Sequence, residues 1–329
     1  MAPRESRIIA VDGKPVSHVR IVYSYLSIYG ARVKAASFGG VCTDPDYRGR
    51  GIASRLLEHC IGEVAEAGAK LLIISGDRGL YLRAGAVLAG PVWSASVRLE
   101  YGTGARTPVT ARPAAPGDAS TLARLYQAEP VRFMRPARFF HSLLGGGHRQ
   151  PWLLEQAGRP VAYMSLSRIW DLPRAAPVRA LGEYAGSRAA LVDGLAAVLP
   201  GAELEEIRLS FPAYDRELAY LLRARGAELS PATVPSHSFR LLDAAGLMRV
   251  LRPYCASRCS AGVLRALRVE PNGERTRLTL GGETVDLDIS QVGALALGGA
   301  EAPVIGGELG AVCARVFPIP LPLPGFNYV

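Results

Sequence analysis

The sequence predicts an α/β (α+β) protein in which a mixed central sheet is flanked by helices. Two observations support this fold class. An apolar strand ending at Thr43 leads through a loop rich in glycine and arginine into a helix from Ile52, and a second apolar strand follows at residues 70–75. The same order of strand, helix, strand and helix recurs between residues 181 and 225. At 329 residues, the chain is long enough for two or three domains.

The chain opens with two predicted strands and a hairpin turn. Residues 7–11 and 16–28 are rich in β-branched and aromatic residues, and an Asp-Gly turn joins them. A glycine turn then leads into a third strand at residues 32–43. This strand ends before Pro45, because proline has no N–H group to donate to a ladder.

The loop after the third strand predicts an anion site. It reads Arg48-Gly49-Arg50-Gly51, and a helical period of apolar residues begins at Ile52. The glycines permit left-handed backbone and a close approach of ligand to backbone. The start of a helix offers free N–H groups and the positive end of the helix dipole, to which the two guanidinium groups add charge.

Two common phosphate-binding patterns are absent from this loop. No Gly-Lys-Ser/Thr follows it, and Ser54 stands where the dinucleotide pattern needs a third glycine. The loop resembles instead the acetyl-CoA pyrophosphate loop of the GNAT superfamily of N-acetyltransferases, whose pattern Arg/Gln-x-x-Gly-x-Gly/Ala is matched by Arg48, Gly51 and Ala53. The resemblance implies the acyl-CoA N-acyltransferase fold with acetyl-CoA as cosubstrate. It implies that the cosubstrate is held by Val41, Cys42, Thr43, Arg48, Gly49, Arg50, Gly51, Ile52, Ala53 and Ser54.

A tyrosine after the next strand is the candidate general acid. Residues 70–75 read as a buried parallel strand, and residues 80–85 read as a short helix that ends at glycine. The segment Tyr81-x-Arg83-x-Gly85 resembles the one that follows this strand in the family, where a tyrosine protonates the departing sulfur of CoA. A phenol with a pKa of about 10 is protonated at neutral pH and can donate to a thiolate. A half-buried core tyrosine is the alternative interpretation.

A second unit repeats the element order of the first. Residues 91–101 alternate as a strand that completes the first unit, and a glycine-rich linker follows at residues 102–108. Strands and helices of the second unit are predicted at residues 109–113, 119–127, 152–155, 161–167, 181–184, 187–199, 206–210 and 217–225. The stretch from Glu183 to Ala189 has no Arg-x-x-Gly-x-Ala pattern. We therefore expect the second unit to be degenerate and not to hold CoA.

The last part of the chain predicts a smaller domain and a strap. A proline-containing linker at residues 230–236 precedes it, and its helices and short strands are predicted at residues 247–254, 264–270, 275–280, 283–288, 289–298 and 309–317. From Phe317 onward, proline alternates with apolar residues, which predicts extended polyproline conformation. So apolar a segment is expected to pack on the protein as a strap.

The whole layout resembles the "enhanced intracellular survival" (Eis) acetyltransferases of actinobacteria. The resemblance implies a GNAT domain with the acetyl-CoA site at residues 1–105, a degenerate second GNAT domain at 106–236 and a sterol-carrier-protein-like domain at 237–329. It also implies that the C-terminal carboxylate, here that of Val329, assists deprotonation of the amine. The opening strand and two helices of the family have no counterpart before Arg7, which bears on acceptor binding.

Composition narrows the class of protein. A hydrophobic content of 49% with 20% charged residues is globular, and no window is apolar enough to span a bilayer or to form a signal peptide, which predicts a cytoplasmic protein. The five scattered cysteines indicate reduced thiols, and no metal site is expected. The net charge of +9 favours acidic partners such as CoA. No dense basic run with interleaved aromatics indicates a nucleic-acid binder.

The predicted function is acetyl-CoA-dependent N-acetyl transfer, directly to a primary amine of a small molecule or a protein. Tyr81 is the expected general acid and the carboxylate of Val329 the expected aid to deprotonation, with no nucleic acid or membrane as partner. The resemblance implies a homo-oligomer. Three alternatives are a covalent acyl-enzyme at Cys42, near which no histidine is expected, a non-catalytic CoA- or lipid-binding scaffold or sensor, and a nucleic-acid binder.

Overall fold

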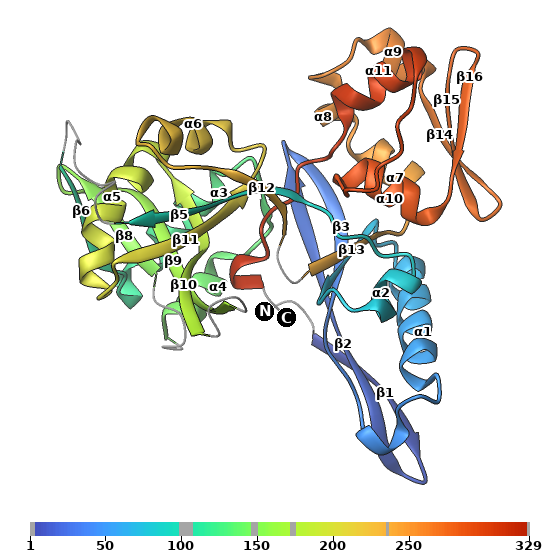
Figure 1. Cartoon of the computed structure of the whole chain (residues 1–329), viewed down its shortest axis with the longest axis horizontal. Helices are drawn as coiled ribbons and strands as arrows, with labels where there is room; N and C mark the ends of the chain where they lie inside the picture. Colours follow the sequence, from blue (N-terminus) through green and yellow to red (C-terminus); the bar gives the residue numbers. More distant parts are fainter. Residues whose placement is uncertain (1–3, 99–107, 146–150, 172–175, 235–236, 328–329) are drawn as a thin grey trace. The chain divides into compact units, whose positions relative to one another are not determined.

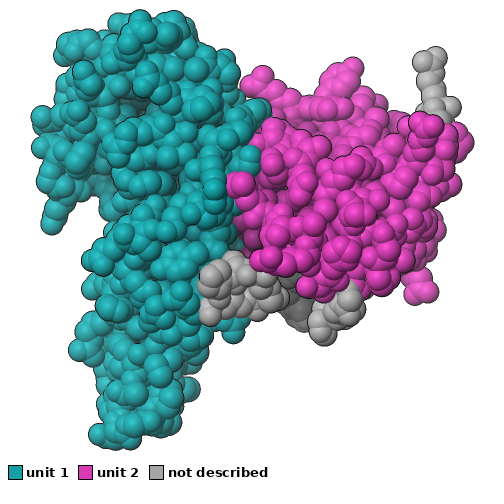
Figure 2. Space-filling model, turned by 180° about the vertical axis from the view of Figure 1, so that it is seen from behind, with its two compact units in different colours: residues 1–90, 233–321, 328–329 teal, residues 91–232, 322–327 magenta. Residues whose placement is uncertain are grey.

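The structure is a computed structural model that describes residues 4–98, 108–145, 151–171, 176–234 and 237–327. Internal contacts divide the chain into two compact units, coloured separately in Figure 2. Unit 1 contains residues 1–90, 233–321 and 328–329, and unit 2 contains residues 91–232 and 322–327. The predicted α/β class, with mixed sheets flanked by helices, is confirmed (Figure 1). The division into three consecutive domains stays a prediction.

The first sheet of unit 1 has the strand order β1-β2-β3-β4-β13. Its strands are β1 (Arg4–Val11), β2 (Lys14–Ile28), β3 (Ala31–Thr43), β4 (Leu71–Ser75) and β13 (His237–Leu241). β3 and β4 run parallel, and the other neighbours run antiparallel. Two helices belong to this part of the chain, α1 (Ile52–Glu66) between β3 and β4 and α2 (Gly79–Arg83) after β4.

Helix α1 lies along one face of this sheet (Figure 1). Its apolar residues recur every three or four positions, so they share one face of the helix. Those buried are Ile52, Leu56, Leu57, Cys60, Ile61 and Val64. All of these except Ile52 share one cluster with strand residues that include Ile21 and Phe38, both fully buried. This core fixes the start of α1 beside the end of β3.

The strand predicted to complete the first unit pairs elsewhere. β5 (Pro91–Arg98) pairs antiparallel with β11 (Glu206–Pro212) in unit 2, and β13 pairs with β4 in unit 1. The prediction was wrong about the partner of β5, because alternation of apolar residues reveals a strand and its buried face but not its neighbour in the sheet. β13 follows directly on a segment expected to be a linker and was not predicted.

The sheet of unit 2 has the order β12-β5-β11-β10-β9-β8-β6. Its further strands are β6 (Val109–Pro113), β8 (Pro151–Gln156), β9 (Arg159–Asp171), β10 (Ala176–Gly186) and β12 (Ser230–Thr233). A short strand, β7 (Val131–Phe133), is not part of this sheet. The helices are α3 (Ala119–Gln127), α4 (Ala137–Gly145), α5 (Arg188–Gly201) and α6 (Arg216–Ala224). β10 and β11 run parallel with α5 between them, which repeats the order β3-α1-β4 of unit 1.

The rest of unit 1 combines short helices with an antiparallel three-stranded sheet. The helices are α7 (Ala244–Val250), α8 (Arg252–Ala256), α9 (Ala261–Ala266), α10 (Ile289–Leu297) and α11 (Gly307–Val316), and the strands are β14 (Arg268–Asn272), β15 (Arg275–Leu280) and β16 (Glu283–Leu287). The strand predicted from residue 264 was wrong at its start. Ser260 caps α9 through the N–H of Val263, so the chain stays helical up to Ala266.

The proline-rich end packs as an extended strap, as predicted. Ile319 and Leu321 are buried, and the Ile319 N–H donates to the carbonyl oxygen of Ala296 at 2.8 Å. In unit 2, the strap ends in a short 3-10 turn, η4 (Gly325–Asn327), whose Phe326 is buried. Val329, the predicted source of a catalytic carboxylate, lies outside the described residues.

Three general features bear on function. All five cysteines are free thiols, as predicted. In the described part of the chain, no three His, Cys, Asp or Glu side chains gather as a metal site would require. None of the helices that the structure describes combines the length and hydropathy needed to cross a membrane.

Candidate functional site

The loop between β3 and α1 leaves the first turn of a helix open to a ligand. Gly49 and Gly51 have left-handed φ angles of +75° and +71°, which residues with a β-carbon adopt at a cost. Gly51 is the N-cap of α1, and no side chain in the described part of the chain caps this helix. The N–H groups of Ile52 to Ser54 therefore lack helical partners and form the positive end of the dipole. Such a position favours an anion.

We expect Gly51→Ala to destabilise this loop and to lower its affinity for an anion. A β-carbon at Gly51 meets no atom within 4 Å, so only the left-handed backbone opposes it, at about 1–2 kcal/mol. Gly62→Ala is the matched control, since Gly62 lies within the same helix in equally open space and should stabilise α1 by up to about 1 kcal/mol. Urea unfolding of both variants measures the two effects. Equal stability changes would contradict the role of the loop backbone.

Two arginines, Arg48 and Arg50, precede α1 in the loop, and both have guanidinium N–H groups available to a ligand. Arg48 Nε donates to the carbonyl oxygen of Thr43 at 3.2 Å, and Arg50 Nη2 donates to that of Asp46 at 3.0 Å. The Arg50 guanidinium also lies 5.0 Å from the ring centroid of Tyr47. Neither arginine forms an ion pair with a carboxylate of the described residues. Because a guanidinium has five N–H donors in a planar fork, both can still bind a phosphate.

A cavity of about 450 Å³ opens at the end of β3. Five predicted cosubstrate residues and two others line it: Val41, Cys42, Thr43, Arg48, Ala53, Arg78 and Leu80. This volume lies in the range of about 300–1,000 Å³ that is usual for small-molecule sites. The remaining predicted residues belong to the same loop and first turn, where the side chain of Ile52 is buried in the core.

Arg78 and Leu80 were not predicted as site residues. Both follow β4, which runs parallel to β3, so the carboxyl ends of the two strands meet at one edge of the sheet. That topology could have indicated them, since ligands bind at this edge in many open α/β sheets. The parallel ladder stops at the pair of Phe38 and Ile74, and β3 continues past it. The end of β3 is thereby left without β4 as a neighbour.

A histidine with no predicted role lies at a bulge in β3. His18 is opposite Cys42 in the β2–β3 ladder, where the register shifts. Its Nδ1 lies 2.9 Å from the carbonyl oxygen of Gly40 and its Nε2 lies 3.0 Å from Ser6 Oγ. Nδ1 carries the proton in this bond, because a carbonyl oxygen only accepts. The expectation that no histidine lies near Cys42 was therefore wrong, although both ring nitrogens have partners other than its thiol.

The register of the β2–β3 hairpin could have indicated this histidine. Ile28 pairs with Ala31 across a two-residue turn. Counting back from that turn places His18 opposite Val41, one residue short of the observed pair. The bulge supplies the missing residue, and a bulge is not visible in an apolar pattern.

Tyr81, the predicted general acid, lies in the hydrophobic core next to the cavity. It is 2% exposed and belongs to the cluster that α1 covers. Its hydroxyl oxygen lies 3.6 Å from the position that a β-carbon on Gly76 would take, just past the end of β4. Burial raises the pKa of Tyr81 above its ordinary value of 10. Its neighbours Arg78 and Leu80 line the cavity.

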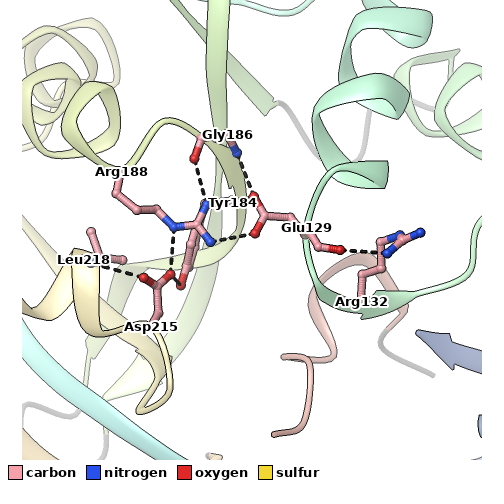
Figure 3. A network of polar contacts seen from close by, with 7 residues as sticks. All are labelled: Glu129, Arg132, Tyr184, Gly186, Arg188, Asp215 and Leu218. Atoms are coloured by element: carbon pink, nitrogen blue, oxygen red, sulfur yellow. Dashed lines mark hydrogen bonds and ion pairs between the residues drawn. The ribbon is translucent and has the colours of Figure 1, made fainter. Parts of the chain in front are cut away.

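The corresponding position of unit 2 is filled by carboxylates of the chain itself (Figure 3). Here β10 leads directly into α5, and the N–H of Gly186 donates to Glu129 Oε1 at 2.8 Å. Arg188 donates to both carboxylate oxygens of Glu129 at 2.7 and 2.6 Å, and its Nε donates to Asp215 Oδ2 at 2.8 Å. The backbone N–H and the arginine that could hold a phosphate thus already bind carboxylates.

Further hydrogen bonds hold this network in unit 2 together. Tyr184 donates its hydroxyl to Asp215 Oδ2 at 2.7 Å, and Asp215 Oδ1 accepts from the Leu218 N–H at 3.1 Å to cap α6 (Figure 3). Burial raises the pKa of Tyr184 well above its ordinary value. Unit 2 has no Arg-x-x-Gly-x-Ala pattern at this position, and the arginine beside the start of α5 is already bound by carboxylates of the chain itself.

Comparison with known proteins finds a family match to the first part of the chain. Residues 2–88 match the family described as Acetyltransferase (GNAT) domain. No curated protein matches. Among solved structures, a GCN5-related N-acetyltransferase from Kribbella flavida aligns with a TM-score of 0.65 and 17% identity over 96% of this chain and 86% of its own.

Two more solved structures show the same fold. A GCN5-related N-acetyltransferase from Anabaena variabilis aligns with a TM-score of 0.65 and 15% identity over 96% of this chain and 88% of its own. Eis1 from Mycobacterium abscessus aligns with a TM-score of 0.58 and 16% identity over 89% and 80%. The mixed α/β fold of the chain is thus that of these acetyltransferases. Residues 2–88 are thus similar to the acetyltransferase (GNAT) domain family, whose members use acetyl-CoA as cosubstrate.

Proposed function

We propose that this chain transfers an acetyl group directly from acetyl-CoA to a primary amine. The observation that carries the proposal is a single cavity lined by the end of β3, Arg48 and the uncapped start of α1. In unit 2, by contrast, Glu129 and Asp215 already bind the arginine at the start of α5, and Glu129 also accepts from the Gly186 N–H. Unit 1 is therefore the unit suited to bind the cosubstrate.

The pyrophosphate of CoA would lie at the start of α1. The free N–H groups of Ile52 to Ser54 point out of the helix end and the dipole favours an anion there. Arg48 and Arg50 would add charge-assisted hydrogen bonds through the donors they keep free. Gly49 and Gly51 allow the backbone to approach the phosphate closely.

The pantetheine arm would pair with the free edge of β3. Past Phe38 this strand has no β4 partner, so the backbone of Val41 and Thr43 can bind an extended arm as an added strand would. The thioester would then lie by the bulge, where N–H groups near Val41 and Cys42 could stabilise the oxyanion of the tetrahedral intermediate. The amine attacks the thioester carbon, and the C–S bond breaks as the sulfur takes up a proton.

Tyr81 is the proposed donor of that proton. Tyr81→Phe is expected to lower kcat by about 10²–10⁴ with the affinity for CoA unchanged. Burial raises the pKa of Tyr81 above its ordinary value, so ionisation of the phenol should lower the wild-type rate only at a higher pH than for a free tyrosine. Tyr23→Phe is the control, since Tyr23 borders the same core cluster. Steady-state rates between pH 7 and 10 measure the effect, and a fully active Tyr81→Phe variant would remove Tyr81 from the mechanism.

The amine must lose a proton before or as it attacks. The resemblance to Eis acetyltransferases implies that the terminal carboxylate of Val329 assists this step. With a pKa of about 3.5, this carboxylate would accept the proton through an ordered water. Removing Val329 displaces rather than abolishes this carboxylate, so amidation of the C-terminus by semisynthesis is the cleaner test of the role.

The proposal also includes the architecture that the resemblance to Eis implies. This architecture has a degenerate second GNAT domain and a sterol-carrier-protein-like third domain, in a cytoplasmic homo-oligomer. The acceptor class is a primary amine, as in polyamines, aminoglycoside-like compounds, protein lysines and amino-acid derivatives. No membrane or nucleic-acid partner is proposed.

One observation favours a second function, that of a non-catalytic CoA-binding scaffold or sensor. Tyr81 lies in the core rather than among the residues that line the cavity. Release of CoA thiol from acetyl-CoA in the presence of each of the four amine classes distinguishes the two functions, with N,N-dimethylated counterparts as controls. The proposed reaction predicts thiol release with a primary amine only. Binding of CoA without turnover on any of these amines would favour the scaffold.

A further inference from the structure

A second cavity of unit 1, of about 370 Å³, is lined by residues of α7, α8, α9 and β14, which are among the elements drawn in orange in Figure 1. It shares none of its described lining residues with the cavity at the end of β3. Its volume is again within the range usual for small-molecule sites. This cavity is therefore a second, separate candidate ligand site in unit 1.

Four arginines line this cavity. They come from three helices and a strand: Arg249 from α7, Arg252 from α8, Arg265 from α9 and Arg268 from β14. Glu270 is the acidic residue among the described lining residues. Positive charges from four elements thus line one cavity, where they repel one another and attract an anion.

These arginines lack the partners that other arginines of the chain have. Arg7, Arg112, Arg135 and Arg188, for example, each donate to carboxylates. Within the described residues, the guanidinium groups of Arg252, Arg265 and Arg268 form neither a hydrogen bond nor an ion pair. Arg249 likewise has no direct partner there, and its charge only helps to lower the pKa of Asp243 from a distance. Asp243 itself is bound to Lys70 at 2.6 Å. The donors of the cavity are therefore free for a ligand.

The remainder of the lining is mostly apolar. Met248, Leu264 and Leu267 are half-buried there, and Cys255 is buried beneath. The arginines are all exposed, so the cavity has an apolar floor and a basic rim. An inorganic anion would leave this floor in contact with water, whereas a hydrocarbon chain or ring would cover it.

We propose that this cavity binds an amphipathic organic anion, a carboxylate or phosphate monoester carried on a hydrocarbon body. The planar fork of each guanidinium matches the two oxygens of such a headgroup. The hydrocarbon body packs on Met248, Leu264 and Leu267. The ligand is either free in solution or the headgroup of a lipid in a bilayer, and both present the same chemistry to the rim. The proposal does not depend on acetyl transfer.

Calorimetric titration of the full chain tests this inference. The probes are dodecyl phosphate and dodecanoate below their micellar concentrations, beside inorganic phosphate, dodecanol and dodecyltrimethylammonium. The site predicts that the two amphipathic anions bind and that the other three bind at least about tenfold more weakly. Added salt should weaken binding, because the rim is exposed to solvent. Equal binding of inorganic phosphate or of the cationic amphiphile would overturn the proposal.

Variants locate the binding. The double substitution Arg252→Gln, Arg265→Gln should weaken the binding of dodecyl phosphate at least about tenfold. The same loss of charge in Arg32→Gln with Arg315→Gln, which lie away from the cavity lining, should leave binding unchanged. Met248→Asp, which places a carboxylate on the floor, should abolish it. Equal binding by the two double variants would overturn the proposal.

A vesicle experiment distinguishes the two sources of the ligand. Binding to phosphatidic acid vesicles that is tighter than binding of the free amphiphile, and that is lost in the Arg252→Gln, Arg265→Gln variant, supports the cavity as a headgroup site. Binding of the free amphiphile without binding to vesicles supports a soluble ligand. No binding of either form by the folded wild-type chain would refute the proposed site.

Discussion

Glu183→Gln is expected to destabilise unit 2 by about 3–5 kcal/mol, because it leaves a buried guanidinium without its counter-charge. Arg135 and Glu183 have side chains only 2% and 6% exposed. They form two parallel hydrogen bonds, from Arg135 Nη1 and Nη2 to Glu183 Oε1 and Oε2, at 2.8 and 2.7 Å. A glutamine can accept only through its single oxygen and would turn an N–H group toward the guanidinium.

The same carboxylate holds two other parts of unit 2. Its Oε1 accepts from the hydroxyl of Tyr163 at 2.7 Å, and its Oε2 accepts from the N–H of Phe326 in the strap at 3.1 Å. The substitution therefore loses partners on the sheet and on the strap together. A buried polar network that is left partly satisfied costs more than any one of its bonds.

Tryptophan fluorescence in urea measures this loss in unit 2 alone. The three tryptophans, Trp93, Trp152 and Trp170, all belong to unit 2. Glu206→Gln is the matched control in the same unit, because its ion-pair partner Arg98 is 65% exposed, an exposed pair contributes about 0–1 kcal/mol, and the oxygen of glutamine can still accept from the Ser96 hydroxyl. Arg135→Met combined with Glu183→Leu removes both charges and should be more stable than Glu183→Gln alone. Similar losses in Glu183→Gln and Glu206→Gln would contradict the buried pair.

Local chemistry made part of the fold predictable from the sequence. The helix predicted at residues 119–127 is α3, and the strand predicted at 109–113 is β6. The loop from Arg48 to Gly51 also follows from short-range rules, because glycines that need positive φ and the start of an amphipathic helix lie within a few residues of one another. Each of these features is decided by neighbours in sequence.

Pairing between distant segments was not predictable in the same way. β5 shows its buried face in its alternation, but its pairing with β11 depends on residues more than a hundred positions away. Glu129 fills the helix start of unit 2 from beyond the end of α3, and nothing in its own segment indicates that place. His18 reaches the bulge only because two strands align. Tyr81 lies in the short helix predicted at residues 80–85, but its burial in one cluster with α1 depends on packing between segments distant in the sequence.

Arg48→Ala combined with Arg50→Ala is expected to weaken CoA binding at least about a hundredfold. Hydrogen bonds to a charged group contribute about 1.5–3 kcal/mol each, and two of them correspond to two or more powers of ten in Kd. Each arginine donates one hydrogen bond to the backbone of the loop, and Arg50 also lies over the ring of Tyr47, so the fold of unit 1 should survive their removal. Arg32→Ala with Arg315→Ala removes the same charge from positions away from the cavity and should change the affinity little at fixed ionic strength.

The most direct test of the acetyl-CoA site is calorimetric titration of acetyl-CoA and of CoA into the wild-type chain and these two double variants. The site described here predicts binding to the wild type, comparable binding to the Arg32, Arg315 variant and a loss of at least about a hundredfold in the Arg48, Arg50 variant. Equal affinity in the two variants, or no binding to a folded wild-type chain, would contradict the assignment of the cavity at the end of β3.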